Sequence, residues 1–259
     1  MDRRDFLLNG SSFLLGGLLG LNTASRALAS ERPKGRLSSK ASMALIIDDI
    51  GYSVPAARRF LDLGVPITFS ILPRLANSYR LAIEINRCGH EIMLHQPMEP
   101  HNSVLDPGPG SLYVGYEGPE ITRILERNMA GVPFAVGVNN HMGSRFTECP
   151  REMNEVLRVV AKNSLFYIDS LTSSRSTACL AARRCNVTAA RRDVFLDNTP
   201  SESCILSRLR RLERCAAVHG GSVGIGHPFP ETARAIKRFL AENRDPRVSL
   251  VHVSSFLES

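Results

Sequence analysis

Short apolar runs alternate with segments of helical periodicity from about residue 43 to the end of the 259-residue chain. The apolar runs predict strands at MALIID (43–48), ITFSIL (67–72), EIMLH (91–95), FAVGVN (134–139), LFYID (165–169), DVFLD (193–197), SVGIG (222–226) and VSLVHV (248–253). Continuous apolar strands that alternate with helices are typical of a mainly parallel sheet covered by helices. About eight such units in ~215 residues predict a single α/β barrel.

The clearest helical pattern covers residues 200–218, where apolar side chains recur every three or four positions. Its expected start is well marked, because Thr199 can cap the helix, Pro200 suits the first helical position and Glu202 completes a capping box. The glycine pair 220–221 is expected to end it.

The first 29 residues have the pattern of an export signal. A charged start with Arg3 and Arg4 is followed by a region of Phe, Leu and Gly and by the sequence Ala27-Leu28-Ala29, a cleavage signal. The stretch RRDFLL resembles the twin-arginine signal. We therefore expect residues 1–29 to be removed by way of the twin-arginine export machinery, leaving a periplasmic or secreted protein without a stable membrane span. The alternative is an uncleaved membrane anchor.

The polar, breaker-rich residues 30–42 are predicted to be a linker, and residues 43–259 a single domain. The formal net charge is +7, and the three arginines and two aspartates of residues 1–29 leave +6 on the mature chain. A basic surface favours an acidic partner such as a cell-wall polymer or a membrane surface. The densest basic cluster (Arg183, Arg184, Arg191 and Arg192) is expected to be a solvated face. The chain has no Trp and only five Tyr, so nothing indicates nucleic-acid binding.

Polar residues that can perform chemistry follow the predicted strands. They are Asp48 and Asp49 after the first strand, His95 after the third, Asn139, Asn140 and His141 after the fourth, Asp169 after the fifth, Asp197 after the sixth and His227 after the seventh. The carboxyl ends of parallel strands open on one face, where active sites lie. A single histidine of this kind is more often a turn residue, but the whole set indicates a site.

Histidine and aspartate in this arrangement favour a hydrolytic metal site. Such a site needs about three protein ligands and an open position, and imidazole with carboxylate suits zinc and similar ions. No C-x-x-C occurs, which argues against a cysteine zinc site. Strand alternation should send the side chains of Asp48 and Asp49 in different directions. One aspartate could then bind the ion while the other takes a proton from water.

Several longer motifs resemble the divergent polysaccharide deacetylase family, a distant branch of the metal-dependent carbohydrate esterases. They are LIIDDIG (45–51), LHQPMEP (94–100), GVNNHMGSRFT (137–147), FYIDS (166–170), RDVFLDN (192–198) and GIGHPFPET (224–232). The resemblance runs from about Met43 to the C-terminus. It implies a distorted (β/α) barrel of seven to eight mainly parallel strands, with the site at the C-terminal ends of the strands. It also implies a polysaccharide substrate and one divalent metal ion, with zinc the first candidate.

The resemblance also implies roles for individual residues. The first acid of the family's motif is the base and the second a metal ligand, which assigns Asp48 as base and Asp49 as ligand. His227 matches the position of the general acid.

The remaining ligands depart from the wider family's pattern. That pattern has two histidines four residues apart, whereas here Glu99 stands four residues after His95. His141 from the next strand could fill the gap, which gives Asp49, His95 and His141 as the expected ligands. Further candidates for an additional ligand or a supporting role are Glu99, Asp169, Arg145 and Asn140.

The expected function is a metal-dependent hydrolase that removes N-acetyl or O-acetyl groups from an envelope or extracellular polysaccharide. The alternative is a non-catalytic glycan-binding or envelope-assembly protein on the same barrel. Loss of the second histidine favours the alternative, whereas retention of Asp48, Asp49 and His227 favours the enzyme. A phosphate-ester hydrolase is a third reading, but it would need more positive charge among the residues at the strand ends.

Overall fold

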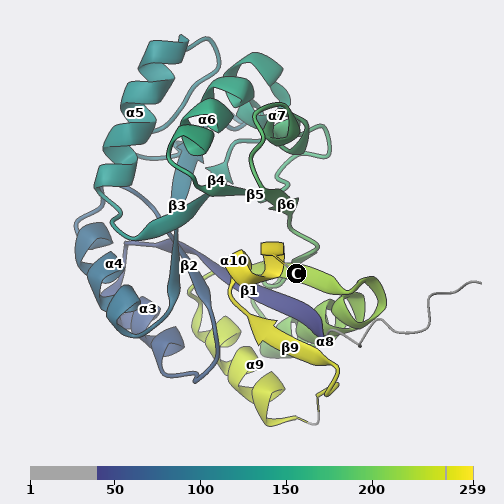
Figure 1. Ribbon diagram of the computed structural model, residues 1–259. Coiled ribbons are helices and arrows are strands. Elements are labelled where there is room, and N and C mark those ends of the chain that lie inside the picture. Colours follow the sequence, from purple (N-terminus) through teal and green to yellow (C-terminus); the bar gives the residue numbers. More distant parts are fainter. Residues whose placement is uncertain (1–39, 243, 259) are drawn as a thin grey trace, which may run out of the picture. The chain divides into compact units, whose positions relative to one another are not determined.

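The computed structural model describes residues 40–242 and 244–258, and Figure 1 shows the arrangement of their helices and strands. The strands in chain order are β1 (Ala41–Ile50), β2 (Thr68–Ile71), β3 (Glu91–Met98), β4 (Ala135–Met142), β5 (Phe166–Asp169), β6 (Ala189–Arg191), β7 (Val194–Phe195), β8 (Gly221–Gly226) and β9 (Val248–Val251). The expected export signal lies outside the described residues. The expected linker 30–42 lies outside them too, apart from its last three residues, of which Ala41 already begins β1.

The strands form one parallel sheet in the order β6-β5-β4-β3-β2-β1-β8-β7. β1 is the longest strand and lies near the middle. It pairs with β8 on one side, and on the other with β9 along its first half and with β2 along its second half. No ladder joins β6 to β7 within the described part of the chain, so the sheet curls into a half-barrel and does not close. The predicted distorted (β/α) barrel is therefore confirmed.

Helices follow most of the strands, and all but the last of them cover one face of the sheet. They are α3 (Val54–Leu61), α4 (Ser78–Arg87), α5 (Gly118–Ala130), α6 (Pro150–Lys162), α7 (Ala178–Arg184), α8 (Glu202–His219), α9 (Pro230–Ala241) and α10 (Val253–Glu258), with a short 3-10 turn η1 (Phe146–Glu148) before α6. Figure 1 shows α3 to α9 arranged around the strands. No helix of the described ranges is long and apolar enough to cross a lipid bilayer.

The alternation of side chains along β1 divides the core into two parts. Met43, Leu45 and Ile47 face the helices and belong to the large cluster that joins them to the sheet. Ala44 and Ile46 point to the concave side and belong to a smaller cluster. Because both faces of a parallel strand are buried, an uninterrupted apolar run was the correct signal for these strands.

The last helix closes the concave side of the sheet at the start of the strands. The backbone N–H of Val253 donates to Thr68 Oγ1 at 3.1 Å, and that of Ser254 to the carboxylate of Glu91 at 3.2 Å. Thr68 and Glu91 are the first residues of β2 and β3. The opposite end of the concave side, where the strands finish, is thereby left for the polar residues.

The helix predicted at 200–218 is α8, but it begins later than predicted. Ser201, in an extended conformation, is its N-cap, whereas Thr199 and Pro200 lie in the preceding turn, where Thr199 O accepts the N–H of Ser201 at 2.8 Å. Gly220 ends the helix as expected, in the left-handed conformation with φ 86°. The strand pattern missed β6, because a run of three residues is too short to show periodicity.

Candidate metal centre

The end of β1 brings the carboxylates of both aspartates close to the ring of His95. Asp48 continues the concave-facing series of Ala44 and Ile46 and is 3% exposed. Asp49 would then face the helices by simple alternation, but its φ of 58° places it in the left-handed region, which aspartate tolerates better than most residues. His95 Nε2 consequently lies 3.7 Å from Asp48 Oδ2 and 3.2 Å from Asp49 Oδ1. The expectation that the two carboxylates point in different directions was wrong, because it assumed regular strand geometry.

Three potential ligand atoms from β1, β3 and β4 form a small triangle. Asp49 Oδ1 lies 2.9 Å from His141 Nδ1 and 3.2 Å from His95 Nε2, and the two nitrogens lie 3.2 Å apart. These are the three residues that the sequence proposed as ligands, and the structure brings them together. The register of the parallel pair explains how, because β3 and β4 align His95 with Asn139 and Pro97 with His141.

The triangle has the dimensions and the chemistry of a zinc-type site. A tetrahedral ion with bonds of about 2.0–2.1 Å holds its ligand atoms roughly 3.3 Å apart. Asp49 Oδ1 is buried and accepts no hydrogen bond of good geometry from the residues that the structure describes, although both imidazole nitrogens lie close to it. Two imidazoles and one carboxylate leave one position of a tetrahedral ion open. The residues present therefore fit a divalent metal ion.

A buried chain of hydrogen bonds fixes the ring of His95. Asn139 Nδ2 donates to Asp48 Oδ1 at 2.8 Å, which turns the amide oxygen of Asn139 toward His95 Nδ1 at 2.7 Å. Ser70 Oγ donates to the same oxygen. Because an amide oxygen can only accept, His95 Nδ1 carries the proton and Nε2 presents its lone pair to the triangle. Such support fixes the tautomer and orientation of a metal-binding histidine.

The two aspartates differ in protonation behaviour. Burial raises the pKa of Asp48 above its ordinary value, and the charges of His95 and His227 offset only part of that effect. Burial also acts on Asp49, but the imidazoles of His141 and His95 close to its carboxylate favour the charged form and hold its pKa well below the usual range. Asp49 is therefore a permanent anion, suited to a cation, while Asp48 has the greater tendency to take up a proton.

His227 follows β8 and is held by Asp197. Its Nδ1 donates to Asp197 Oδ1 at 2.9 Å, and its backbone N–H donates to Asp197 Oδ2 at 2.5 Å. Thr232 Oγ1 also donates to Asp197 Oδ2. Burial lowers the pKa of His227, but the hydrogen bond and charge of Asp197, with the charges of Asp48 and Asp49, raise it to about 9. His227 Nε2, 3.7 Å from Asp49 Oδ2, therefore carries a proton at neutral pH.

These groups open on a cavity of about 420 Å³, hereafter the catalytic cavity. Its lining includes Asp48, His95, His141, Arg192 and His227. Asn140 and Met142 of β4 also line it, and the loop after β5 and the segment around β7 supply the rest of the wall, through Ser170, Leu171, Thr172, Phe195 and Asn198. A cavity of this size can admit a small molecule or one unit of a larger one.

Two of the other proposed residues pair with each other and not with the metal triangle. Glu99 Oε1 accepts from Arg145 Nη1 at 2.7 Å, and Glu99 Oε2 accepts the backbone N–H of Val114 at 2.7 Å. The backbone carbonyl of Glu99 also accepts the N–H of Arg145. Glu99 therefore holds the loops after β3 and β4 together, and neither it nor Arg145 belongs to the group that could hold an ion.

Asn140 and Asp169 shape the wall of the catalytic cavity. Asn140 Oδ1 accepts the backbone N–H of Ser170 at 3.0 Å, and its Nδ2 donates to Met142 O at 2.8 Å. Asp169 Oδ1 accepts the N–H of Leu171 at 2.9 Å, and burial raises the pKa of this carboxyl. Both side chains thus organise the loop after β5, and neither is part of the ligand triangle.

Sequence reasoning gave no role to Asn139, Asp197 or Arg192. The first two were noticed only as residues that follow strands, and their hydrogen-bond partners lie far away along the chain. Arg192 was assigned to a solvated face together with Arg183 and Arg191. The other arginines of that cluster are exposed, but Arg192 is half buried, lines the catalytic cavity and donates to Ser170 O at 2.8 Å. No local pattern distinguishes it from its neighbours.

Comparison with known proteins agrees with this architecture. The uncharacterised protein YibQ of Escherichia coli (strain K12) is 33% identical over 218 residues, which cover 83% of this chain and 67% of YibQ. The crystal structure of the uncharacterised protein ATU2773 from Agrobacterium tumefaciens C58 superposes with a TM-score of 0.78 at 27% identity, covering 86% of this chain and 92% of that one.

A more distant structure shares the fold alone. It is a BA3943 mutant, described as a CE4 family pseudoenzyme with restored enzymatic activity, with a TM-score of 0.51 at 15% identity over 85% of this chain and 68% of that one. Residues 45–257 match the family described as divergent polysaccharide deacetylase. The chain belongs to the divergent polysaccharide deacetylase family.

Proposed function

We propose that the protein is a metal-dependent deacetylase that removes acetyl groups from an envelope or extracellular polysaccharide. The observation that carries this proposal is the convergence of Asp49 Oδ1, His95 Nε2 and His141 Nδ1 beside a buried carboxylate and a protonated imidazole. Membership of the family supports a carbohydrate substrate. Fold alone would not decide the reaction, because one fold can carry several functions.

The metal would be held by Asp49, His95 and His141, with zinc the ion that best suits two imidazoles and a carboxylate. A bound divalent ion supplies a Lewis acid that polarises the acetyl carbonyl and makes water more acidic. The chain contributes the fixed orientation of these ligands. In particular, the hydrogen bond from His95 Nδ1 to Asn139 keeps the lone pair of His95 Nε2 directed at the ion.

Asp48 and His227 would move the protons. Asp48 accepts the proton of the attacking water, and its raised pKa makes it a stronger base than an ordinary aspartate. His227, protonated because Asp197 raises its pKa, donates a proton to the amine or alcohol that leaves the acetyl carbon. Each group lines the catalytic cavity, so each can reach a substrate bound there.

A non-catalytic glycan-binding protein is the second candidate. It is favoured by Glu99, which occupies the place of the wider family's second histidine and is paired with Arg145. A protein of this kind would keep the cavity but would not need the proton-transfer groups. The two candidates therefore differ in what they require of Asp48.

The test is acetate release from acetylated cell-wall and exopolysaccharide fragments, measured together with metal content. Asp48→Asn should lower the rate by roughly 10²–10⁴-fold and keep the metal, because it removes the base and preserves the ligands. Asp49→Asn should lose both metal and activity. Asp62→Asn, an exposed aspartate at the end of α3, is the matched control and should change neither. A wild type that releases no acetate, and an Asp48→Asn variant that binds glycan as well as wild type, would establish the binding protein.

A further inference from the structure

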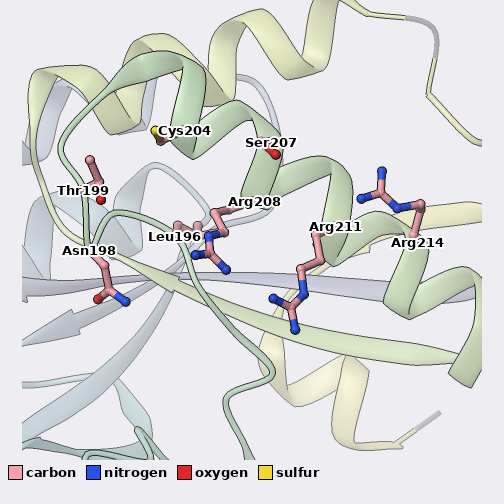
Figure 2. Close-up of a pocket in the computed structure, with 8 residues that line it drawn as sticks. All are labelled: Leu196, Asn198, Thr199, Cys204, Ser207, Arg208, Arg211 and Arg214. Carbon is pink, nitrogen blue, oxygen red and sulfur yellow. The ribbon is translucent and has the colours of Figure 1, made fainter.

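A second cavity, of about 410 Å³, adjoins the catalytic one (Figure 2). Its floor is the segment after β7, with Leu196, Asn198 and Thr199, and its wall is one face of α8, with Arg208 and Arg211 among the lining side chains. Asn198 lines both cavities. A chain-like ligand whose reacting unit sits beside His227 could therefore continue into this second cavity, hereafter the arginine groove.

Three arginines of the arginine groove recur every three residues along α8, at Arg208, Arg211 and Arg214. All three are exposed, and none forms an ion pair or side-chain hydrogen bond with another described residue. Among the described residues, no aspartate or glutamate lines the groove. Figure 2 shows Arg208 and Arg211 extending to the same side of the helix, toward the floor of the groove, while Arg214 points away from them.

The other arginines of α8 and α9, outside the groove, form ion pairs. Arg210, on another face of α8, holds Glu242 with bonds of 2.7 and 3.0 Å. Arg234 on α9 pairs with Glu202 at 3.3 Å and with Glu231 at 2.7 Å. Acidic side chains thus neutralise the other arginines of α8 and α9, whereas the arginines that line the groove have no counter-charge among the described residues. A row of uncompensated guanidinium groups attracts anions.

We propose that the arginine groove binds anionic groups of the polysaccharide, carboxylate or phosphate, in the units next to the one that is deacetylated. The proposal rests on the proposed function for the identity of the reacting group. A guanidinium is planar and can hold a carboxylate or a phosphate with two parallel hydrogen bonds. The three lining arginines span about 9 Å of the helix axis, and Arg214 points away from the other two, so they do not converge on one small ion and suit charges repeated along a polymer.

The other lining groups favour a glycan over a nucleic acid. Asn198, Thr199 and Ser207 offer an amide and two hydroxyls, which can exchange hydrogen bonds with sugar hydroxyls. In the part of the chain that the structure describes, no aromatic side chain lines the groove, so the groove lacks the platforms on which bases stack. Arg192 extends the positive charge into the catalytic cavity. The substrate class is therefore a polyanionic, acetylated glycan.

The experiment compares two double variants that remove the same charge. Arg208→Gln/Arg211→Gln acts inside the groove, whereas Arg210→Gln/Arg234→Gln removes two ion-paired arginines outside it. The probes are hyaluronan oligosaccharides, which carry carboxylates, teichoic acid fragments, which carry phosphodiesters, neutral chitin oligosaccharides of matched length and a single-stranded oligonucleotide. Affinities are measured by calorimetry, and the first two probes distinguish the two kinds of anion.

We expect wild type to bind at least one anionic glycan more tightly than the neutral one and the oligonucleotide. The groove variant should lose roughly 5- to 20-fold in affinity for that glycan, and the control variant less than about twofold. Cys204 lines the groove, so the same glycan should slow its alkylation, with the exposed Cys88 outside the groove as reference.

Three results would overturn the inference: equal affinity for charged and neutral glycans, equal losses in both double variants, or oligonucleotide binding as tight as glycan binding. The proposed function is judged separately by acetate release. Glycan binding that depends on the groove, without acetate release, would support the proposal for the arginine groove and refute the proposed deacetylase activity. Acetate release together with glycan binding that does not depend on the groove would refute the proposal for the arginine groove and support the proposed deacetylase activity.

Discussion

The catalytic cavity and the arginine groove lie next to each other but hold their polar groups in opposite ways. Asp48 and His95 are almost completely buried, and each is oriented by a hydrogen bond to Asn139. Arg208 and Arg211 are exposed and have no protein partner among the described residues. Bond-making needs reacting groups held in one geometry, whereas a polymer needs accessible charge that adapts to it.

The two regions also differ in what their charged groups cost the stability of the folded protein. A buried charge that lacks a partner costs stability, so the groups of the catalytic cavity form a connected network that ends at the three ligand atoms. Exposed arginines remain hydrated, and their mutual repulsion is weak in water. Changes in the first region should therefore affect metal binding and folding, and changes in the second should affect neither.

The largest expected difference between the two regions concerns stabilisation by metal. Zinc at about 100 times its dissociation constant should stabilise the folded protein by about 2.7 kcal/mol, or roughly 5–10 °C in melting temperature. Asp49→Asn should abolish the shift, because it removes the anionic ligand, and Arg208→Gln/Arg211→Gln should preserve it. Thermal melts with zinc and with a chelator measure this. A full shift in Asp49→Asn would exclude the assigned ligand set.

The next effect tests the support of His95. Asn139→Ala should weaken zinc binding by roughly 10- to 100-fold, because the ring of His95 loses the acceptor that fixes its tautomer. Competition with a chelating dye measures the affinity. Asn86→Ala, at an exposed position of α4, is the control and should leave it unchanged. Unaltered affinity in Asn139→Ala would mean that His95 needs no such support.

A smaller effect should appear in the pH dependence of stability. The pKa of His227 is raised to about 9 in the folded protein from an ordinary 6.5. Its contribution is therefore complete below about pH 6.5 and lost as pH rises through about 9. Asp197→Asn should reduce that loss, because it removes the main cause of the raised pKa. Urea unfolding of the chelator-treated protein at pH 6 and pH 9.5 measures it, and identical pH dependence in both proteins would refute the assignment.

The smallest effect is expected in the arginine groove. Arg208→Gln/Arg211→Gln should change the free energy of unfolding by no more than about 0.5 kcal/mol, because exposed side chains without partners contribute little. Urea unfolding at neutral pH measures the change. A loss of several kcal/mol would show that these arginines stabilise α8, and it would remove the contrast between the two regions.

Strand positions and most of the chemical residues could be predicted from the sequence. The run from Met43 to Ile47 is apolar because both faces of β1 are buried, and Asp48 is the first polar residue after that run. Strand-end placement also identified His95 and His227. The starts of helices were predicted less well, since Thr199 and Pro200 carry the residue types of a cap but lie before it.

The sequence by itself thus determined the α/β class, the parallel sheet and the edge of that sheet where the polar residues gather, because these depend on the spacing of apolar residues along one chain. Tertiary structure alone decided the rest. The left-handed backbone of Asp49 and the register that places His141 beside His95 set the triangle. Pairing with Arg145 kept Glu99 out of it. Which arginines lack a counter-charge likewise depends on contacts between α8 and α9. Such contacts join residues that lie far apart in the sequence, so no local pattern could predict them.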